Sequence, residues 1–117
     1  MRVIARSTLR GFVEARVEHR LKASVKGHLD AWYTEVSRAE WKTSAELKQQ
    51  YRSASIVSAS RVVFNIRGNE FRLVASINFS YQVLFVKWVG THAEYDRIDV
   101  EEVEYDESRY TGTPGKN

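Results

Sequence analysis

The sequence predicts an α+β fold in which N-terminal helices pack on one face of a small antiparallel β-sheet. Two observations predict it. Apolar residues in the first half of the chain recur at helical spacing, and residues 61–97 contain three runs of β-branched and aromatic residues broken by turn residues. The 117 residues suffice for one domain with a modest core, and no internal repeat or domain boundary divides them.

Two apolar stripes predict two helices in the first forty residues. The first helix is expected to begin at Ser7, whose hydroxyl can cap it, and the second to follow a break near residues 19–24. Gly27 lies inside the second pattern and costs about 1 kcal/mol relative to alanine, which leaves the start of that helix open. The stripes consist of Leu9, Phe12, Val13 and Val17, and then Val25, Leu29, Trp32 and Val36.

A short third helix is predicted after Thr43. Thr43 and Glu46 have the spacing of a capping box, and Leu47 and Tyr51 form an apolar pair one turn apart. Residues 52–60 are small and polar, which indicates a connector with room for one short edge strand. Three aromatic residues on or beside the helical stripe are interpreted as core rather than as base-stacking platforms: Trp32, Tyr33 and Trp41.

Turn residues set the register of the antiparallel meander. A two-residue loop at Gly68-Asn69 places Asn65 opposite Arg72, and a second loop at Ser80-Tyr81 places Val74 opposite Lys87 on the same face. One face is then apolar and needs helices to cover it: Val62, Phe64, Ile66, Phe71, Leu73, Ala75, Ile77, Phe79, Leu84, Val86 and Trp88. The other face is mixed and carries Arg61, Asn65, Arg67, Arg72, Asn78 and Lys87 together with Val63, Val74 and Phe85.

The net charge of +3 is the sum of a basic region and an acidic region. Residues 1–97 carry 16 Lys or Arg and 9 Asp or Glu, a net +7, whereas residues 98–117 carry 2 and 6, a net −4. A basic body suits a polyanionic partner such as nucleic acid, although many small soluble proteins are mildly basic without one. The acidic run can remain solvated or fold back over the basic body, and we favour the solvated state.

Residues 1–107 are expected to form the single domain and residues 108–117 a disordered tail, because Gly112, Pro114 and Gly115 leave little to bury. Within the acidic run, Ile98, Val100, Val103 and Tyr105 could pack as a last element. The absence of cysteine excludes disulfides and thiolate sites. No apolar run reaches the roughly 20 residues that span a bilayer, so a soluble cytoplasmic protein without a membrane partner is expected.

Several polar residues at one rim of the predicted sheet suit phosphodiester cleavage by an RNA 2′-hydroxyl. His92, the only histidine in the sheet half of the chain, can transfer protons near neutral pH. Tyr95 lies on the same side if this stretch forms a helical turn. Arg72 and Lys87 can stabilise charge on the phosphoryl oxygens, and Asn65 adds a neutral donor and acceptor.

Each of these residues also has a purely structural interpretation. His92 could only hydrogen-bond a turn, and Arg72 and Lys87 could belong to a solvated sheet face. A metal site at His92, Glu94 and Asp96 is not predicted, because no further histidine or cysteine stands at ligand spacing. Alternate residues moreover share a face only in an extended segment.

The stretch Phe64-Asn-Ile-Arg-Gly-Asn-Glu-Phe-Arg-Leu-Val74, followed by Val89-Gly-Thr-His-Ala-Glu-Tyr-Asp96, resembles the HigB family of toxins from bacterial toxin–antitoxin pairs, within the RelE-like superfamily. The resemblance extends upstream to residues 29–33, 39–43 and 47–48 and covers nearly the whole chain except its tail. It implies a small α/β ribonuclease that cuts messenger RNA on the ribosome without a metal or other cofactor. It also implies a HigA-like antitoxin partner with a helix-turn-helix domain.

The resemblance also implies site residues. By position, Arg72 matches the arginine that the superfamily places on the strand after the first hairpin, His92 stands where some relatives have an arginine or histidine, and Tyr95 corresponds to their C-terminal tyrosine. We expect catalytic roles for His92, Arg72, Lys87 and Tyr95 and substrate binding by Asn65, Arg67, Asn69 and Arg61. The opposing hypothesis is a basic sheet face that binds RNA or a protein partner without cutting.

Overall fold

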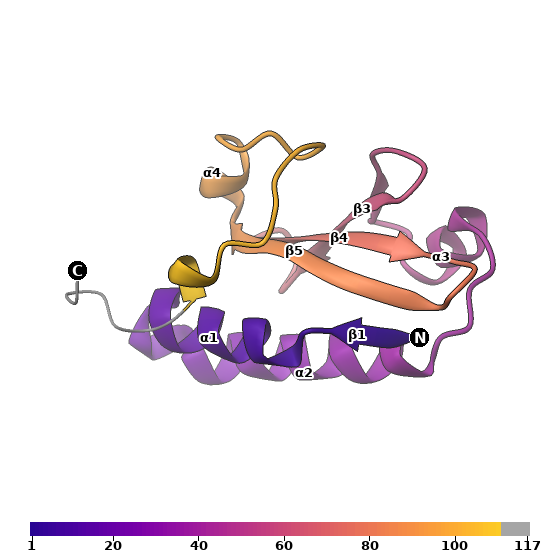
Figure 1. The fold of residues 1–117 in the computed structure, drawn as a ribbon. Coiled ribbons are helices and arrows are strands. Elements are labelled where there is room, and N and C mark those ends of the chain that lie inside the picture. Colours follow the sequence, from indigo (N-terminus) through magenta and orange to yellow (C-terminus); the bar gives the residue numbers. More distant parts are fainter. Residues whose placement is uncertain (111–117) are drawn as a thin grey trace.

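A computed structural model describes residues 1–110 and confirms the α+β class. Helices α1 and α2 form one layer and the sheet forms the other (Figure 1). In chain order the elements are β1 (Arg2–Ile4), α1 (Arg6–Arg16), the 3₁₀ turn η1 (His19–Leu21), α2 (Lys22–Arg38), α3 (Ser44–Gln50), β2 (Ser55–Ile56), β3 (Arg61–Ile66), β4 (Phe71–Asn78), β5 (Val83–Thr91), α4 (His92–Tyr95) and the 3₁₀ turn η2 (Glu107–Tyr110).

The sheet has five strands in the order β1-β5-β4-β3-β2. Strands β2 to β5 pair antiparallel as predicted, and β2 is the short edge strand in the connector. The expectation of a purely antiparallel sheet is wrong at the other edge, where β1 pairs parallel with β5. A strand of three residues shows no alternation that a sequence pattern could reveal. The long connection from β1 to β5, which contains the helices and the other strands, permits the parallel pairing.

The helices differ from the predicted ones in two details. Helix α1 begins at Arg6, and Ser7 does not cap it. The expected break shrinks to the single turn η1, so Gly27 lies inside α2, at an exposed position where a Cβ would meet no atom within 4 Å. The predicted cap of α3 is present, because Thr43 Oγ1 accepts a hydrogen bond from Glu46 N at 3.2 Å.

The main core lies between the helices and the sheet. All eight residues of the two predicted helical stripes are buried there. Phe12 meets Phe71 edge to face with ring centroids 5.8 Å apart, and Trp32 meets Phe64 in the same way at 5.3 Å. Trp32 and Trp41 are both buried, which confirms that they are core residues.

The first hairpin has the predicted register, with Asn65 opposite Arg72. Its loop is longer than predicted, because residues 67–70 form a four-residue turn. Arg67 and Gly68 have φ angles of 55° and 66°, a region that glycine enters freely and other residues rarely. The longer turn leaves the pairing unchanged, so the two strands present the same faces as predicted.

The second hairpin keeps the predicted register only as far as Ala75, which lies opposite Val86. The register then shifts by one residue, so that Val74 lies opposite Trp88 instead of Lys87. The prediction that Trp88 faces the helices is therefore wrong. Its side chain belongs to a separate cluster on the opposite face.

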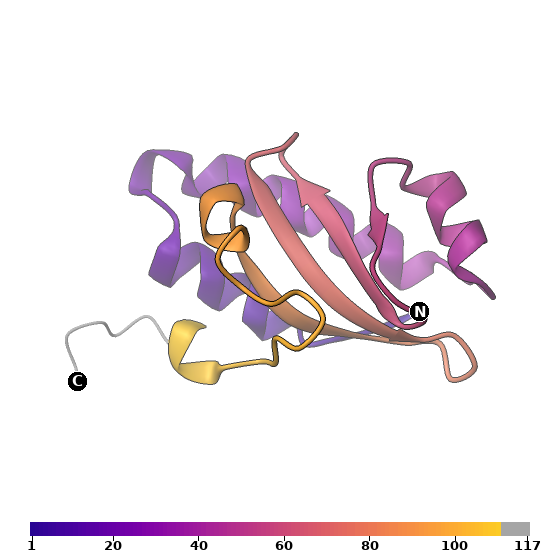
Figure 2. The same ribbon diagram turned by 90° about the horizontal axis from the view of Figure 1, so that it is seen from above.

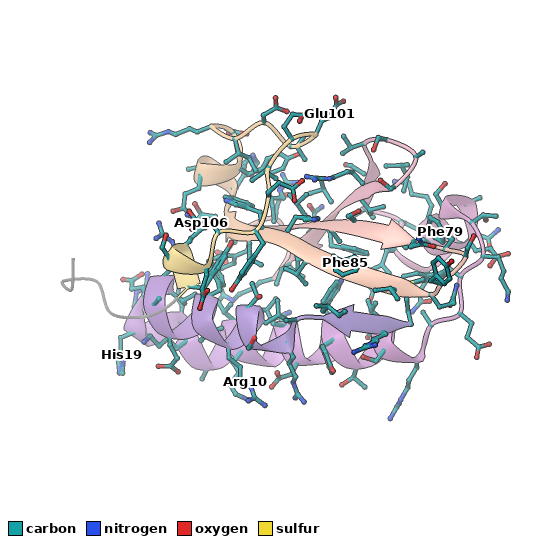
Figure 3. All side chains as sticks on the ribbon, viewed as in Figure 1. Arg10, His19, Phe79, Phe85, Glu101 and Asp106 are labelled. Atoms are coloured by element: carbon teal, nitrogen blue, oxygen red, sulfur yellow. The ribbon has the colours of Figure 1, made fainter. Side chains whose placement is uncertain are left out.

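That second face of the sheet has a small core of Val63, Val74 and Trp88. The segment after α4 covers it and crosses the strands (Figure 2). Our favoured expectation that the acidic run stays solvated is wrong, because apolar residues alternate with the acids and pack on this core: Ile98, Val100 and Val103. Acidic residues between them point outward, as Glu101 does (Figure 3).

The turn η2 ends the described part of the chain. Tyr110 is only 6% exposed, and η2 lies against α1. The disorder expected from Ser108 onward is therefore wrong for residues 108–110, while residues 111–117 lie outside the described part. Within residues 1–110, no helix is long and apolar enough to cross a membrane.

Candidate active site

The strand register gives Arg72 one neighbour on each adjacent strand. Arg72 on β4 pairs with Asn65 on β3 and with Gly90 on β5. A Cβ at Gly90 would lie 2.4 Å from the Trp88 ring and 2.6 Å from Arg109 Nη2. The missing side chain at this position therefore lets the surrounding side chains approach the strand closely.

Three neighbours hold the guanidinium of Arg72. Its Nη1 donates to Asn65 Oδ1 at 2.6 Å, and its Nη2 donates to His92 Nδ1 at 3.3 Å. Its Cζ atom lies 5.4 Å from the centroid of the Tyr95 ring, within the range of a cation–π contact. Arg72, Asn65, His92 and Tyr95 thus form one group of side chains, the rim cluster.

His92 is the first residue of α4 and follows β5 directly. Its backbone N donates to Glu70 O at 2.9 Å, which ties the turn to the first hairpin. Its side chain is 44% exposed, and its Nε2 lies 3.8 Å from Asp96 Oδ2. Because arginine has only donors, Nδ1 accepts from Arg72, and the proton of the neutral ring sits on Nε2.

Tyr95 lies three residues after His92 on the same helical turn, as predicted. Its ring centroid is 6.3 Å from that of Trp88, with the planes tilted by 52°. The position of Trp88 beside this cluster was not predictable from the sequence, because the register shift in β5 that turns it to this face has no signature in the spacing of apolar residues.

Lys87 and Arg61 do not join the rim cluster. Both pair with Glu104 in the acidic segment: Lys87 Nζ donates to Oε1 at 2.8 Å and Arg61 Nη2 to Oε2 at 2.7 Å. The hydrogen bond from Lys87 and the positive charges of both partners hold the pKa of Glu104 below its ordinary value. Arg61 is itself buried and also donates to Val103 O at 2.6 Å, so it anchors the segment that crosses this face.

Arg67 and Asn69 lie in the loop of the first hairpin. Arg67 Nε donates to Ser24 Oγ on α2 at 2.8 Å, and its Nη1 pairs with Glu70. This side chain therefore reaches toward the helix layer rather than toward the rim cluster. Asn69 is exposed in the turn.

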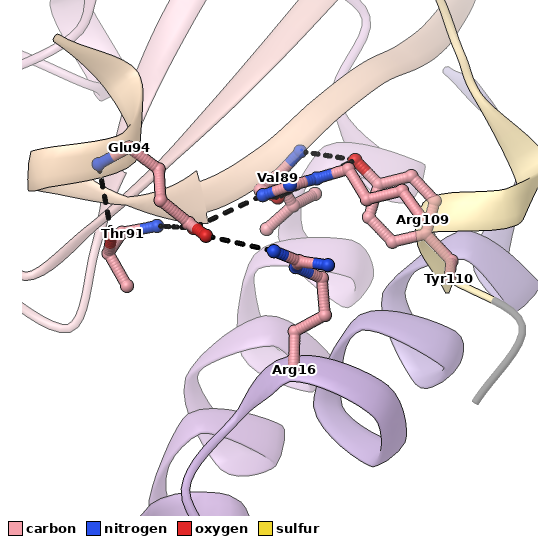
Figure 4. A network of polar contacts seen from close by, with 6 residues as sticks. All are labelled: Arg16, Val89, Thr91, Glu94, Arg109 and Tyr110. Carbon is pink, nitrogen blue, oxygen red and sulfur yellow. Dashed lines mark hydrogen bonds and ion pairs between the residues drawn. The ribbon is translucent and has the colours of Figure 1, made fainter. Parts of the chain in front are cut away.

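Glu94 connects the turn α4 to parts of the chain that sequence reasoning did not bring to this site (Figure 4). Its Oε1 accepts from Thr91 N at 2.9 Å and from Arg109 Nη2 at 3.1 Å, and its Oε2 accepts from Arg16 Nη2 at 3.1 Å. Burial raises the pKa of Glu94, but the hydrogen bond from Thr91 and the two arginines outweigh it and the pKa lies below the ordinary value. Arg109 falls in the tail expected to be disordered, so no sequence signal pointed to it.

The rim cluster combines a permanent cation, an imidazole, an amide and a phenol. Such a set can bind an anionic oxygen and transfer a proton near it. Across residues 1–110, no three His, Asp or Glu side chains are grouped so that they could hold a metal ion.

Comparison with known proteins identifies the family. A family model described as HigB toxin, the RelE-like toxic component of a toxin–antitoxin system, matches residues 25–98. The mRNA interferase toxin HigB of Escherichia coli (strain K12) is 28% identical over 98 residues, which cover 82% of this chain and 88% of the relative. The mRNA interferases HigB of Escherichia coli O157:H7 and of Shigella flexneri match with the same values. Because the matched region is more than half of the chain and contains the whole rim cluster, the chain belongs to the HigB family of RelE-like toxins from toxin–antitoxin systems.

Proposed function

We propose that this chain is an mRNA interferase, an endoribonuclease that cuts messenger RNA on the ribosome. The relatives are named mRNA interferases, which supports the substrate and the class of reaction. The observation that carries the proposal is the contact between Arg72 and His92, because it joins a permanent cation to a proton-exchanging ring at an accessible rim.

The nucleophile in this proposal is the 2′-hydroxyl of the RNA. Its oxygen forms a bond to phosphorus while the bond between phosphorus and the 5′ oxygen breaks, which leaves a 2′,3′-cyclic phosphate and a 5′-hydroxyl. One proton must leave the 2′ oxygen and one must reach the 5′ oxygen. The catalyst therefore has to move protons and to stabilise the charge that builds up on the phosphoryl oxygens.

Arg72 and His92 divide these tasks. The guanidinium of Arg72 turns its donors toward the phosphoryl oxygens, where they are most effective in the transition state. When Nη2 binds the phosphate, His92 Nδ1 loses its present hydrogen bond and can accept the 2′ proton. The 5′ oxygen takes a proton from His92 Nε2 or from water as its bond to phosphorus breaks, which balances the proton lost by the 2′ oxygen.

The other expected residues contribute orientation and binding. Asn65 holds the guanidinium of Arg72 through the 2.6 Å hydrogen bond, and the ring of Tyr95 offers a surface on which a base can stack. Asn69 is exposed in the loop of the first hairpin and extends the contact with RNA there, whereas Arg67 stays bonded to Ser24 and Glu70 on the side of the helices. Lys87 reaches RNA only when Glu104 releases it, whereas the buried Arg61 keeps its role as the anchor of the crossing segment.

A toxin of this kind acts in the cytoplasm, where ribosomes and messenger RNA are found. Its partner is an antitoxin of the HigA kind with a helix-turn-helix domain, which suppresses the toxin by binding it. Membership of a toxin–antitoxin family supports the antitoxin partner.

Cleavage of a defined messenger RNA, with and without ribosomes, tests the proposal. We expect cuts within the message only when ribosomes are present, with a 5′-hydroxyl on the downstream product and a cyclic phosphate on the upstream one. Equal cleavage of free RNA would reject the requirement for the ribosome. RNA that is bound but intact under both conditions would support a binding module instead of an enzyme.

A further inference from the structure

We infer that Arg109 is a positioning residue for RNA cleavage: it holds the turn that presents His92 and Tyr95 against the end of β5. The catalytic consequence rests on the proposed function, whereas the positioning itself rests on contacts in the structure alone. Nothing about the sequence around Arg109 marks it, because it lies among the turn-forming and acidic residues of the C-terminal segment.

The turn α4 needs support from outside. It has only four residues, and helices of this length are unstable in isolation. A capping box stabilises it, in which Thr91 Oγ1 accepts from Glu94 N at 3.1 Å and Glu94 Oε1 accepts from Thr91 N at 2.9 Å. The same Oε1 also accepts from Arg109 Nη2 at 3.1 Å, so the orientation of the capping carboxylate depends on Arg109.

Arg109 reaches three parts of the site at once. Besides Glu94, its Nη2 donates to Val89 O at 3.0 Å, and its Cζ atom lies 4.8 Å from the ring of Trp88, the neighbour of Tyr95. Its side chain is only 17% exposed. The guanidinium thus joins the end of β5, the aromatic pair and the cap of α4 in one place.

An open strand edge explains why η2 docks here. β1 pairs with β5 only at residues 83–85, so β1 leaves Val89 N and O without a partner. Tyr110 Oη accepts from Val89 N at 3.0 Å and Arg109 donates to Val89 O, which satisfies both groups. On the other side, a Cβ at Gly11 would lie 2.3 Å from Tyr110 O, so α1 provides a notch for the turn.

Arg16 contacts the same carboxylate from a more exposed position than Arg109. Arg16 Nη2 and Glu94 Oε2 are 3.1 Å apart, and both side chains are 36% exposed. Ion pairs this accessible to solvent stabilise structure very little. The structure therefore assigns the positioning role to Arg109 rather than to Arg16.

Three variants test the inference. In Arg109→Gln, the single-turnover rate constant for cleavage of ribosome-bound message should fall about tenfold or more, because a slight misplacement of a reacting group is costly, while the apparent Kd changes little. Arg109→Lys should recover part of the rate, because it keeps a charge beside Glu94. Arg97→Gln removes the same charge from an exposed position and should cleave at the wild-type rate.

The imidazole ¹⁵N signals of His92 supply a readout that does not depend on cleavage. In the wild type we expect these signals to show one fixed tautomer of His92. In folded Arg109→Gln we expect them to show an average of the two tautomers, while the amide signals of α1 and α2 remain unchanged. Wild-type His92 signals in that variant would overturn the inference. If circular dichroism shows Arg109→Gln to be unfolded, Arg109→Lys carries the same comparison. If the wild-type protein cleaves no RNA, the proposed function is rejected. The His92 signals would still show whether Arg109 holds the turn α4 in place.

Discussion

Arg72 owes its orientation to contacts that act in different directions. Asn65 binds the guanidinium at Nη1, His92 contacts it at Nη2, and the ring of Tyr95 lies 5.4 Å from its Cζ atom. A cation held in this way loses little conformational entropy when a phosphate binds. The same arrangement selects the tautomer of the neutral His92 ring in which Nδ1 is the hydrogen-bond acceptor.

Replacing Arg72 tests its role in the transition state. We expect Arg72→Ala to slow cleavage by about 10² to 10³-fold, because a charge that faces the reacting phosphate acts mainly where negative charge builds up. Ribosome binding should weaken much less. The rate and the affinity are measured on the same preparation, with the exposed Arg52→Ala as the control for lost charge. Equal losses in both measurements would make Arg72 a docking residue.

At the scale of elements, the turn α4 is a short structure that depends on the charge of Glu94. The pKa of Glu94 lies below its ordinary value, because hydrogen bonds and two arginines outweigh burial. A carboxylate with a lowered pKa stabilises the fold above its unfolded-state pKa, and this contribution is lost as the pH falls through the folded-state value. The stabilisation of α4 by Glu94 is therefore complete near neutrality and is lost in acid, at a pH below the ordinary pKa of a glutamate.

Hydrogen exchange of the α4 amides measures this dependence. We expect their protection to fall in acid in the wild type, ahead of the amides of β4. Glu94→Gln should give a lower protection that no longer changes over this range of pH. An acid-induced loss of the same size in Glu94→Gln would assign the effect to another group.

The elements that could be predicted are those that leave a local pattern in the sequence. The hairpin turns, the helical stripes and the cap at Thr43 are local, and they led to the correct helix layer and to Asn65 opposite Arg72. The shift in β5 that turns Trp88 over is set by packing on the second face, and β1 is too short for a pattern. The contacts of Arg109 form only when η2 docks on the end of β5. The predicted site therefore lacked the residue that holds the turn α4 in place.

At the scale of the whole molecule, the acidic segment covers the second face of the sheet and forms ion pairs with two of its basic residues. Glu104 pairs with Arg61 and Lys87, which were expected to face RNA. The rim cluster lies outside this pairing, at the end of the sheet next to α4. The molecule therefore keeps one cation, Arg72, at the site and holds two others against its own C-terminal segment.

Glu104→Gln tests whether this pairing competes with RNA. Loss of the carboxylate charge should free Lys87 and tighten RNA binding at low salt, and the gain should shrink as salt shortens the screening length to about 8 Å. The matched control is Glu101→Gln, which removes the same charge from an exposed position. An equal gain in both variants would show a general charge effect rather than competition at Lys87.

Cleavage of RNA at the rim cluster depends most directly on His92. We predict that cells producing the wild-type protein acquire new 5′-hydroxyl ends within messenger RNA, and that His92→Gln, produced in equal amount and folded, yields none. The variant should stay folded, because the side chain is half exposed at the rim and lies outside both cores. The measurement is a map of 5′ ends in total RNA from the two strains. The same ends at the same frequency with His92→Gln would contradict the rim cluster as the active site.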